Sequence, residues 1–180
     1  MSQWPRWEVF KKDTEKKPYQ AVGSVHAVDP EHALLNAKNV FVRRPAAVSL
    51  WVTPAAAIYA KTAEELANEP LYAERIAPES SQPFAIFRKA SHRRSITFMD
   101  YVGEVSAGTP QLALQQAIDQ FSDKPGLAWW VIPMSAITST ASDMAEAWFD
   151  PAKTKTYKQQ SQYGFVSKLR EGRKGSVTGE

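Results

Sequence analysis

A long residue pattern occurs twice in this chain, and it restricts the possible folds more than any other feature. Residues 22–41 and 102–121 share the pattern V-G-x-V-x-A-x-x-P-x-x-A-L-x-x-A-x-x-x-F. A further match follows each copy, because Trp-Val-Thr-Pro at 51–54 corresponds to Trp-Val-Ile-Pro at 130–133. Chance does not keep so many apolar and structure-breaking residues in one order, so we interpret the chain as a tandem duplication.

Each copy carries the local signals of two strands, a helix and a third strand. Asp29-Pro30 and Thr109-Pro110 predict helix starts, because the side-chain oxygen accepts from a free amide and proline needs none there. An apolar stripe continues each helix to Phe41 or Phe121. Gly23 predicts a bulge or a close backbone approach within a strand. The predicted strands cover 7–10, 19–27 and 48–52 in the first copy and 84–89, 96–107 and 127–131 in the second, with short helical turns at 55–60 and 134–140.

These elements predict an α+β protein made of two tandem ββαβ modules. We expect each module to have an antiparallel-rich sheet covered by one helix, and the two modules to pack as a pseudo-twofold dimer. A turn or two of helix is expected near Thr62–Leu66, inside the linker. The predicted boundaries are 1–60 for the first repeat, 61–83 for the linker, 84–140 for the second repeat, 141–169 for a C-terminal aromatic segment and 170–180 for a flexible tail.

Composition restricts the class of protein further. The 180 residues include no cysteine, which excludes disulfide scaffolds, thiol nucleophiles, zinc fingers and iron–sulfur ligation and favours a reducing compartment. The formal charge of +3 is small for a nucleic-acid binder. We see neither a signal peptide nor an apolar run of the roughly 18–20 residues that a membrane span needs. The expected protein is cytoplasmic and binds neither membrane nor nucleic acid.

Catalytic and metal-binding patterns are missing from the sequence. His26, His32 and His92 have no second histidine or carboxylate at metal-ligand spacing, and no Glu-x-x-His pair exists for a helical di-iron site. Phosphate-binding glycine loops and nucleophile-elbow motifs are also absent. We therefore expect no catalytic, cofactor-binding or metal-binding residue in this chain.

Tryptophan and arginine point instead to protein contacts. Arg43-Arg44 ends the first predicted helix, where the pair either stabilises the helix dipole or anchors carboxylates of a partner. Trp129 and Trp130 are adjacent in a predicted strand, so their rings must point to opposite faces of the sheet. Six tryptophans are more than a core of this size needs, and we expect about half of them at an interface.

The order of these residues resembles the PaaB family, one of the components of the ring-1,2-phenylacetyl-CoA epoxidase. The matching residues of the first copy are Gly23-Ser24-Val25-His26-Ala27, Arg43-Arg44 and Ser49-Leu50-Trp51-Val52. The C-terminal element of the family occurs once, from Phe149-Asp150-Pro151-Ala152 to Tyr157. The second copy departs from the pattern, with Ser106 for His26, Asp123-Lys124 for Arg43-Arg44 and Trp129 for Leu50.

The resemblance implies a non-catalytic assembly subunit that bridges helical oxygenase subunits in phenylacetate degradation. Its implied partners are a ferritin-like di-iron subunit and a related helical companion, while iron, FAD, an iron–sulfur cluster and NADPH belong to partner subunits. Two alternatives stay open: a sheet that stacks single-stranded nucleic acid, and an acyl-CoA binder or small enzyme using the cleft between the copies. The expected partner-binding residues are Arg43, Arg44, Trp51, Trp129, Trp148, Phe149, Asp150 and Tyr157.

Overall fold

The computed structural model describes residues 3–42, 47–68, 81–92, 99–141 and 145–154, and it is an α+β fold with an antiparallel sheet, as predicted. We call residues 3–68 the first half and residues 81–154 the second half. The first half contains β1 (Arg6–Lys12), β2 (Gln20–His26), α1 (Pro30–Phe41), β3 (Ser49–Pro54), η1 (Ala55–Ala57), β4 (Tyr59–Thr62) and α2 (Ala63–Asn68). The second half contains β5 (Gln82–Lys89), β6 (Asp100–Ala107), α3 (Pro110–Gln120), β7 (Ala128–Pro133), η2 (Met134–Ala136), β8 (Thr138–Ser139) and α4 (Ala145–Thr154).

All eight strands form one sheet, in the order β4-β7-β5-β6-β2-β1-β3-β8, with every described pair antiparallel. The sequence predicted two sheets. They are joined because the ends of β2 and β6 meet at Gln20 and Asp100. Backbone hydrogen bonds flank this contact, from the Ala21 amide to the Met99 carbonyl at 2.9 Å and from Tyr101 to Tyr19 at 2.8 Å.

The last strand of each half pairs with the other half. β4 lies along β7, with Tyr59 opposite Val131 and Thr62 opposite Ala128. β8 in turn lies along β3, with Trp51 opposite Ser139. The predicted turns at 55–60 and 134–140 are helical only in η1 and η2, and the chain then extends into these crossing strands. Each half therefore completes the sheet of the other.

Local signals explain where the two long helices begin. The Asp29 carboxylate accepts a hydrogen bond from the His32 amide at 2.7 Å, and the Thr109 hydroxyl accepts one from Leu112 at 3.3 Å. Proline occupies the first helical position in both cases. The predicted helix caps are confirmed. The helix expected near Thr62–Leu66 is also present, as α2.

Gly23 and Gly103 let a ring pack against the second strand of each half. Their φ angles are +141° and +155°, which side-chain-bearing residues rarely adopt, and a bulge lies opposite each in β1 or β5. A Cβ at Gly103 would lie 2.6 Å from the Phe121 ring. The bulge and close approach predicted for Gly23 are confirmed, and both recur in the second half.

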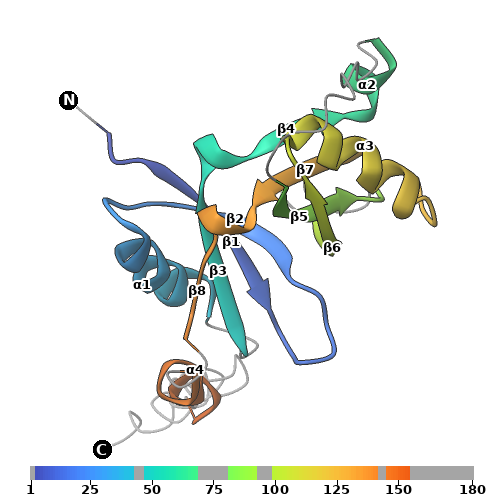
Figure 1. The fold of residues 1–180 in the computed structure, drawn as a ribbon. Helices are drawn as coiled ribbons and strands as arrows, with labels where there is room; N and C mark the ends of the chain where they lie inside the picture. Colours follow the sequence, from blue (N-terminus) through green and yellow to red (C-terminus); the bar gives the residue numbers. More distant parts are fainter. Residues whose placement is uncertain (1–2, 43–46, 69–80, 93–98, 142–144, 155–180) are drawn as a thin grey trace, which may run out of the picture.

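Three groups of buried side chains hold the molecule together, and Figure 1 shows α1 and α3 on opposite sides of the strands. A first helical cluster lies under α1, and it includes Trp7, Val9, Leu34, Leu50, Val52 and Phe149. A second helical cluster lies under α3, and it includes Phe84, Ile86, Leu114, Trp129 and Val131. A central cluster joins the two halves through Phe10, Ala21, Ala85, Phe87, Met99 and Ile132.

Candidate interaction surface

Among the described residues, the side chains do not assemble a metal site. No group of three or more histidine, aspartate or glutamate side chains lies close enough to hold an ion in that part of the chain. His26 contacts the Trp4 carbonyl at 2.9 Å, and the His32 ring lies 5.3 Å from the Trp4 ring. None of the helices in the described ranges is long and apolar enough to span a membrane.

Most aromatic rings of the sheet pack between the two halves. The Phe10 and Phe87 rings, one from each half, lie 4.2 Å apart and are fully buried. Trp51 stacks on Tyr19 at 3.8 Å and meets the Tyr101 ring edge-on at 5.7 Å. The aromatic face of the sheet is therefore largely internal, and Trp51 lies half-buried at its margin.

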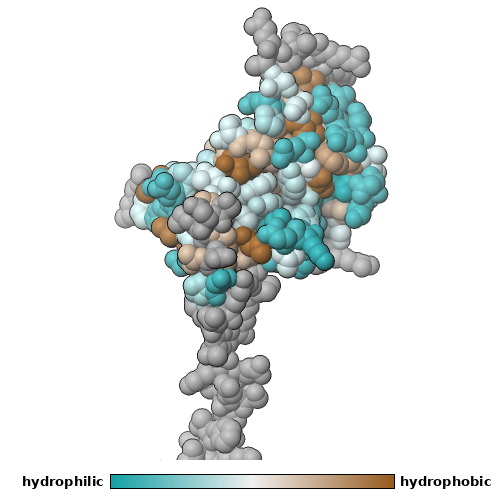
Figure 2. All heavy atoms as spheres, turned by 60° about the horizontal axis from the view of Figure 1, so that its bottom comes forward, coloured by the Kyte–Doolittle hydropathy of each residue, from teal (hydrophilic) through white to brown (hydrophobic). Residues whose placement is uncertain are grey.

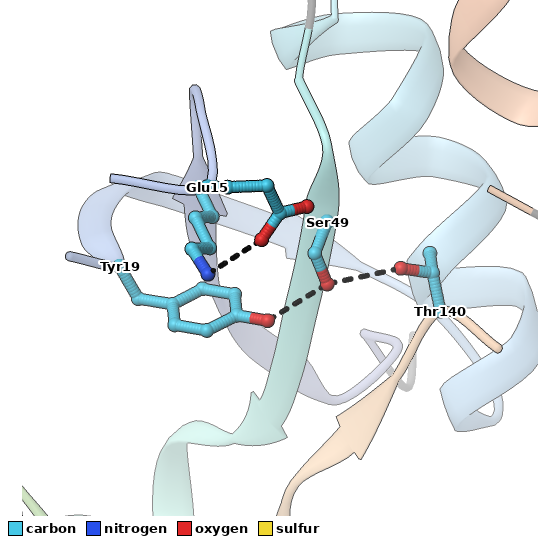
Figure 3. A network of polar contacts seen from close by, with 5 residues as sticks. Glu15, Tyr19, Ser49 and Thr140 are labelled. Carbon is cyan, nitrogen blue, oxygen red and sulfur yellow. Dashed lines mark hydrogen bonds and ion pairs between the residues drawn. The ribbon is translucent and has the colours of Figure 1, made fainter. Parts of the chain in front are cut away.

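A chain of hydroxyl groups fixes the surroundings of Trp51 (Figure 3). Tyr19 donates to Ser49 Oγ at 2.8 Å, and Ser49 lies 3.2 Å from the Thr140 hydroxyl. Thr140 Oγ1 also accepts from the Leu50 amide at 3.2 Å. These contacts join the loop after β1, strand β3 and the segment after β8, so Tyr19 holds Trp51 in a defined position.

Trp129 lies in the second helical cluster with 4% of its surface exposed, which leaves a partner almost none of this ring. The Arg88 guanidinium lies 5.6 Å from the ring centroid. Arg88 also donates to the Phe121 carbonyl, to Asp123 at 2.8 Å and to the Lys124 carbonyl at 3.3 Å. The hydrogen bond from Arg88 lowers the pKa of Asp123. Arg88 thus ties the end of α3 to the sheet.

The three expected partner residues on α4 lie against the first half. Phe149 is 2% exposed inside the first helical cluster, and Trp148 packs half-buried beside it. The Lys38 ammonium of α1 lies 4.9 Å from the Trp148 ring centroid. Asp150 is exposed on the same helix. This aromatic segment therefore docks within the chain, and Trp148 and Asp150 keep surface on its outer side.

The expected partner residues do not form one site. Trp51 borders the central cluster, Trp129 belongs to the second helical cluster, and Trp148 and Phe149 cover the first. The expectations for Arg43, Arg44 and Tyr157 lie outside the described residues.

Four exposed apolar side chains were missed by the sequence reasoning. Among the described residues, the large hydrophobic side chains that are clearly exposed are Trp4 (53%), Val28 (55%), Leu35 (48%) and Val40 (52%). All four belong to the first half. A comparison of the two repeats position by position would have found two of them, because Gln115 and Gln120 replace Leu35 and Val40. On the face seen in Figure 2, hydrophobic residues form separate small patches among hydrophilic ones.

An open hollow of about 760 Å³ lies beside Trp4, between the start of β1 and the turn after β3. Arg6 lines it and lies 3.3 Å from the Glu8 carboxylate, whose side chain is only 11% exposed. Burial raises the pKa of Glu8, and the positive charge of Arg6 partly opposes this. Arg6 itself is 59% exposed, so its guanidinium stays available to a second carboxylate.

A smaller polar hollow of about 290 Å³ lies near the junction of β2 and β6. Lys11 and Lys17 line it, but both ammonium groups approach Asp13, at 2.9 Å and 3.5 Å. Burial of Asp13 acts to raise its pKa, yet the hydrogen bonds and charges of these two lysines outweigh it and lower the pKa. The two cations are thus already paired, which disfavours this hollow as a phosphate site.

The family model described as "Phenylacetic acid degradation B" matches residues 3–75 and 81–170, which is most of the chain. This chain belongs to the phenylacetic acid degradation B family. A curated relative from Escherichia coli (strain K12), named as a subunit (component B) of 1,2-phenylacetyl-CoA epoxidase, is 40% identical over 62 residues. That match covers 34% of this chain and 65% of the relative. No solved structure matches the chain.

Membership of the phenylacetic acid degradation B family gives the two halves a common frame. The matched stretches contain all the described strands and helices, including the crossing strands β4 and β8. The exposed apolar residues of α1 and the Trp4 segment also lie within the first stretch.

Proposed function

We propose that this chain is a non-catalytic assembly subunit of a multicomponent di-iron phenylacetyl-CoA epoxidase in phenylacetate degradation. The observation that carries the proposal is the family match over both stretches of the chain, together with a relative named as one subunit of such an epoxidase. A protein named as one subunit implies others, and in this proposal the other subunits hold the di-iron centre, FAD, the iron–sulfur cluster and the site for NADPH.

The two halves would act as a fused pair of like modules with pseudo-twofold packing. The strand order supports this, because β4-β7-β5-β6 from one edge corresponds to β8-β3-β1-β2 from the other. The contact of Phe10 with Phe87 and that of Gln20 with Asp100 join equivalent positions of the two repeats. A fused pair avoids the entropy cost of bringing two separate protomers together.

A bridging role follows from the placement of the helices in this proposal. α1 and α3 lie on opposite sides of the strands (Figure 1), so helical partners could be held on two sides. The partners would be the ferritin-like di-iron subunit and its helical companion. Of the partner-binding residues expected from the sequence, the half-buried or exposed Trp51, Trp148 and Asp150 keep surface for this role.

The two alternatives lack a suitable surface among the described residues. A base-stacking sheet needs exposed rings, but Phe10, Phe87 and their neighbours fill the central cluster. The same cluster fills the contact between the halves, where an acyl-CoA cleft would have to lie. Titration of the isolated chain with phenylacetyl-CoA, and with single-stranded nucleic acid at several salt concentrations, should therefore give no binding.

Reconstitution tests the proposal. The purified di-iron subunit, its companion and the reductase should form the epoxide of phenylacetyl-CoA only when this chain is added, and the chain should co-elute with the helical subunits. The isolated chain should contain no iron by elemental analysis and show no turnover with reductase and NADPH. Full epoxidation without this chain, or turnover by the chain without the di-iron subunit, would contradict the proposal.

A further inference from the structure

Resting on the proposed assembly role, we propose that one outer face of the first half docks an acidic amphipathic helix of a helical oxygenase subunit. We call this face the α1 stripe, and it consists of Trp4, Val28, His32 and Leu35. The second half would not provide an equivalent site, so each chain would hold one such helix.

The stripe covers the N-terminal part of α1. Leu35 follows His32 by three positions, which is the spacing of neighbours on one helix face, and Val28 directly precedes the cap residue Asp29. The Trp4 ring extends the stripe sideways, because it meets the His32 ring edge-on at 5.3 Å. Trp4, Val28 and Leu35 are each about half exposed, at 53%, 55% and 48%. An apolar ridge of this form is what an amphipathic helix covers.

Hydrogen bonds hold the Trp4 segment in place before any partner binds. The Ala27 amide donates to the Pro5 carbonyl at 3.1 Å, and the His26 ring contacts the Trp4 carbonyl at 2.9 Å. The Asn36 side chain of α1 donates to the His26 carbonyl at 3.2 Å. An exposed tryptophan on a fixed backbone loses little freedom on binding, which favours its use as an anchor.

Charge and size indicate the occupant. Of the described residues around the hollow beside Trp4, Arg6 alone carries a formal charge, so a partner carboxylate would be attracted to it. A stable homodimer buries about 800 Å² on each copy, more than three half-exposed side chains offer. The stripe is therefore suited to one helix within a larger assembly and not to a second copy of this chain.

The second half lacks the features of the stripe. The positions equivalent to Val28 and Leu35 hold Gly108 and Gln115, and Gln115 is exposed. The stripe is thus a property of the first half alone, whereas the caps, the bulges and the glycine contacts occur in both.

The test measures the affinity of the purified di-iron subunit and companion complex for variants of the full-length chain. Leu35→Gln places on α1 the residue that α3 has, and it should weaken binding at least about tenfold. Trp4→Ala should act in the same direction. Val40→Gln is the matched control, because Val40 is 52% exposed on the same helix but lies five residues, about 140° around the axis, from Leu35. It should leave affinity within about twofold.

The outcomes separate this proposal from the assembly role. Equal binding by wild type, Leu35→Gln and Val40→Gln overturns the stripe and leaves the assembly role intact, while no binding by wild type overturns both. A wild-type dimer in analytical ultracentrifugation that Leu35→Gln converts to a monomer would identify a second copy as the occupant and overturn the proposal. Arg6→Gln should reduce the salt dependence of the wild-type affinity, and an unchanged salt dependence would contradict an acidic occupant.

Discussion

Removal of the Phe10 ring tests whether the central cluster unites the two halves. Phe10 is fully buried, with the Phe87 ring at 4.2 Å and the Trp130 ring at 6.2 Å. Truncation of a buried phenylalanine to alanine removes about 3–5 kcal/mol of stability, against a total of about 5–15 kcal/mol for an ordinary domain. We expect Phe10→Ala to lower the free energy of unfolding in urea by that amount in one cooperative transition, because the ring supports both halves.

A double-mutant cycle isolates the contact. Phe10→Ala and Phe87→Ala should couple by about 0.5–1.5 kcal/mol, the usual range for an aromatic pair. Phe84→Ala is the matched control, because Phe84 is also fully buried on β5 but lies in the second helical cluster under α3. Its loss should add to that of Phe10→Ala within about 0.5 kcal/mol. Two separate unfolding transitions, or equal coupling of Phe10 to Phe84 and Phe87, would refute the reasoning.

Three further variants test local features. Arg88→Met should lower stability by about 3–5 kcal/mol in urea unfolding, because the carbonyls of Phe121 and Lys124 lose a buried donor, whereas Asp123→Asn should have a smaller effect at this exposed carboxylate. Gly103→Ala should lower stability by about 1–3 kcal/mol and more than Gly23→Ala, because its Cβ would lie 2.6 Å from the Phe121 ring against 3.0 Å from Phe41. The raised pKa of Glu8 adds stability only below its ordinary value near 4.5, and that contribution is lost as pH rises through the raised value; Glu8→Gln should therefore gain in melting temperature over wild type between pH 4 and pH 7, and a constant difference would contradict this.

Elements with adjacent signals were predictable from the sequence. Asp29-Pro30 and Thr109-Pro110 start their helices through contacts three residues away, so the letters contain all the information needed. The same applies to Gly23, where a positive φ within a strand leaves glycine as the natural choice. The coarse α+β class follows from such local elements.

Long-range pairing was not predictable. Tyr59–Thr62 is short and polar enough to suggest a linker, and it becomes a strand only because β7 lies beside it, far along the sequence. The same reason affects the candidate site. The sequence places Trp129 and Trp130 on opposite faces, but it does not show that α3 covers one face and the other half covers the second.

The exposed residues of α1 were overlooked for a different reason. Helix analysis looks for the apolar side that faces the sheet, and Ala33, Leu34 and Ala37 satisfy it. Leu35 and Val40 then look like ordinary scatter on the outside of a helix. Their meaning depends on comparison with Gln115 and Gln120, which only the internal repeat makes possible.

The shortness of the two outermost strands has a consequence for how this protein can associate. β4 has four residues and β8 has two, and they form the two margins of the sheet. Such brief margins expose few unpaired amides and carbonyls, so they are poor templates for a foreign strand and discourage fibril-like self-association. Neighbours recruited by this molecule would therefore be recognised through side chains, and its solubility at high cellular concentration would be protected by the same economy of backbone.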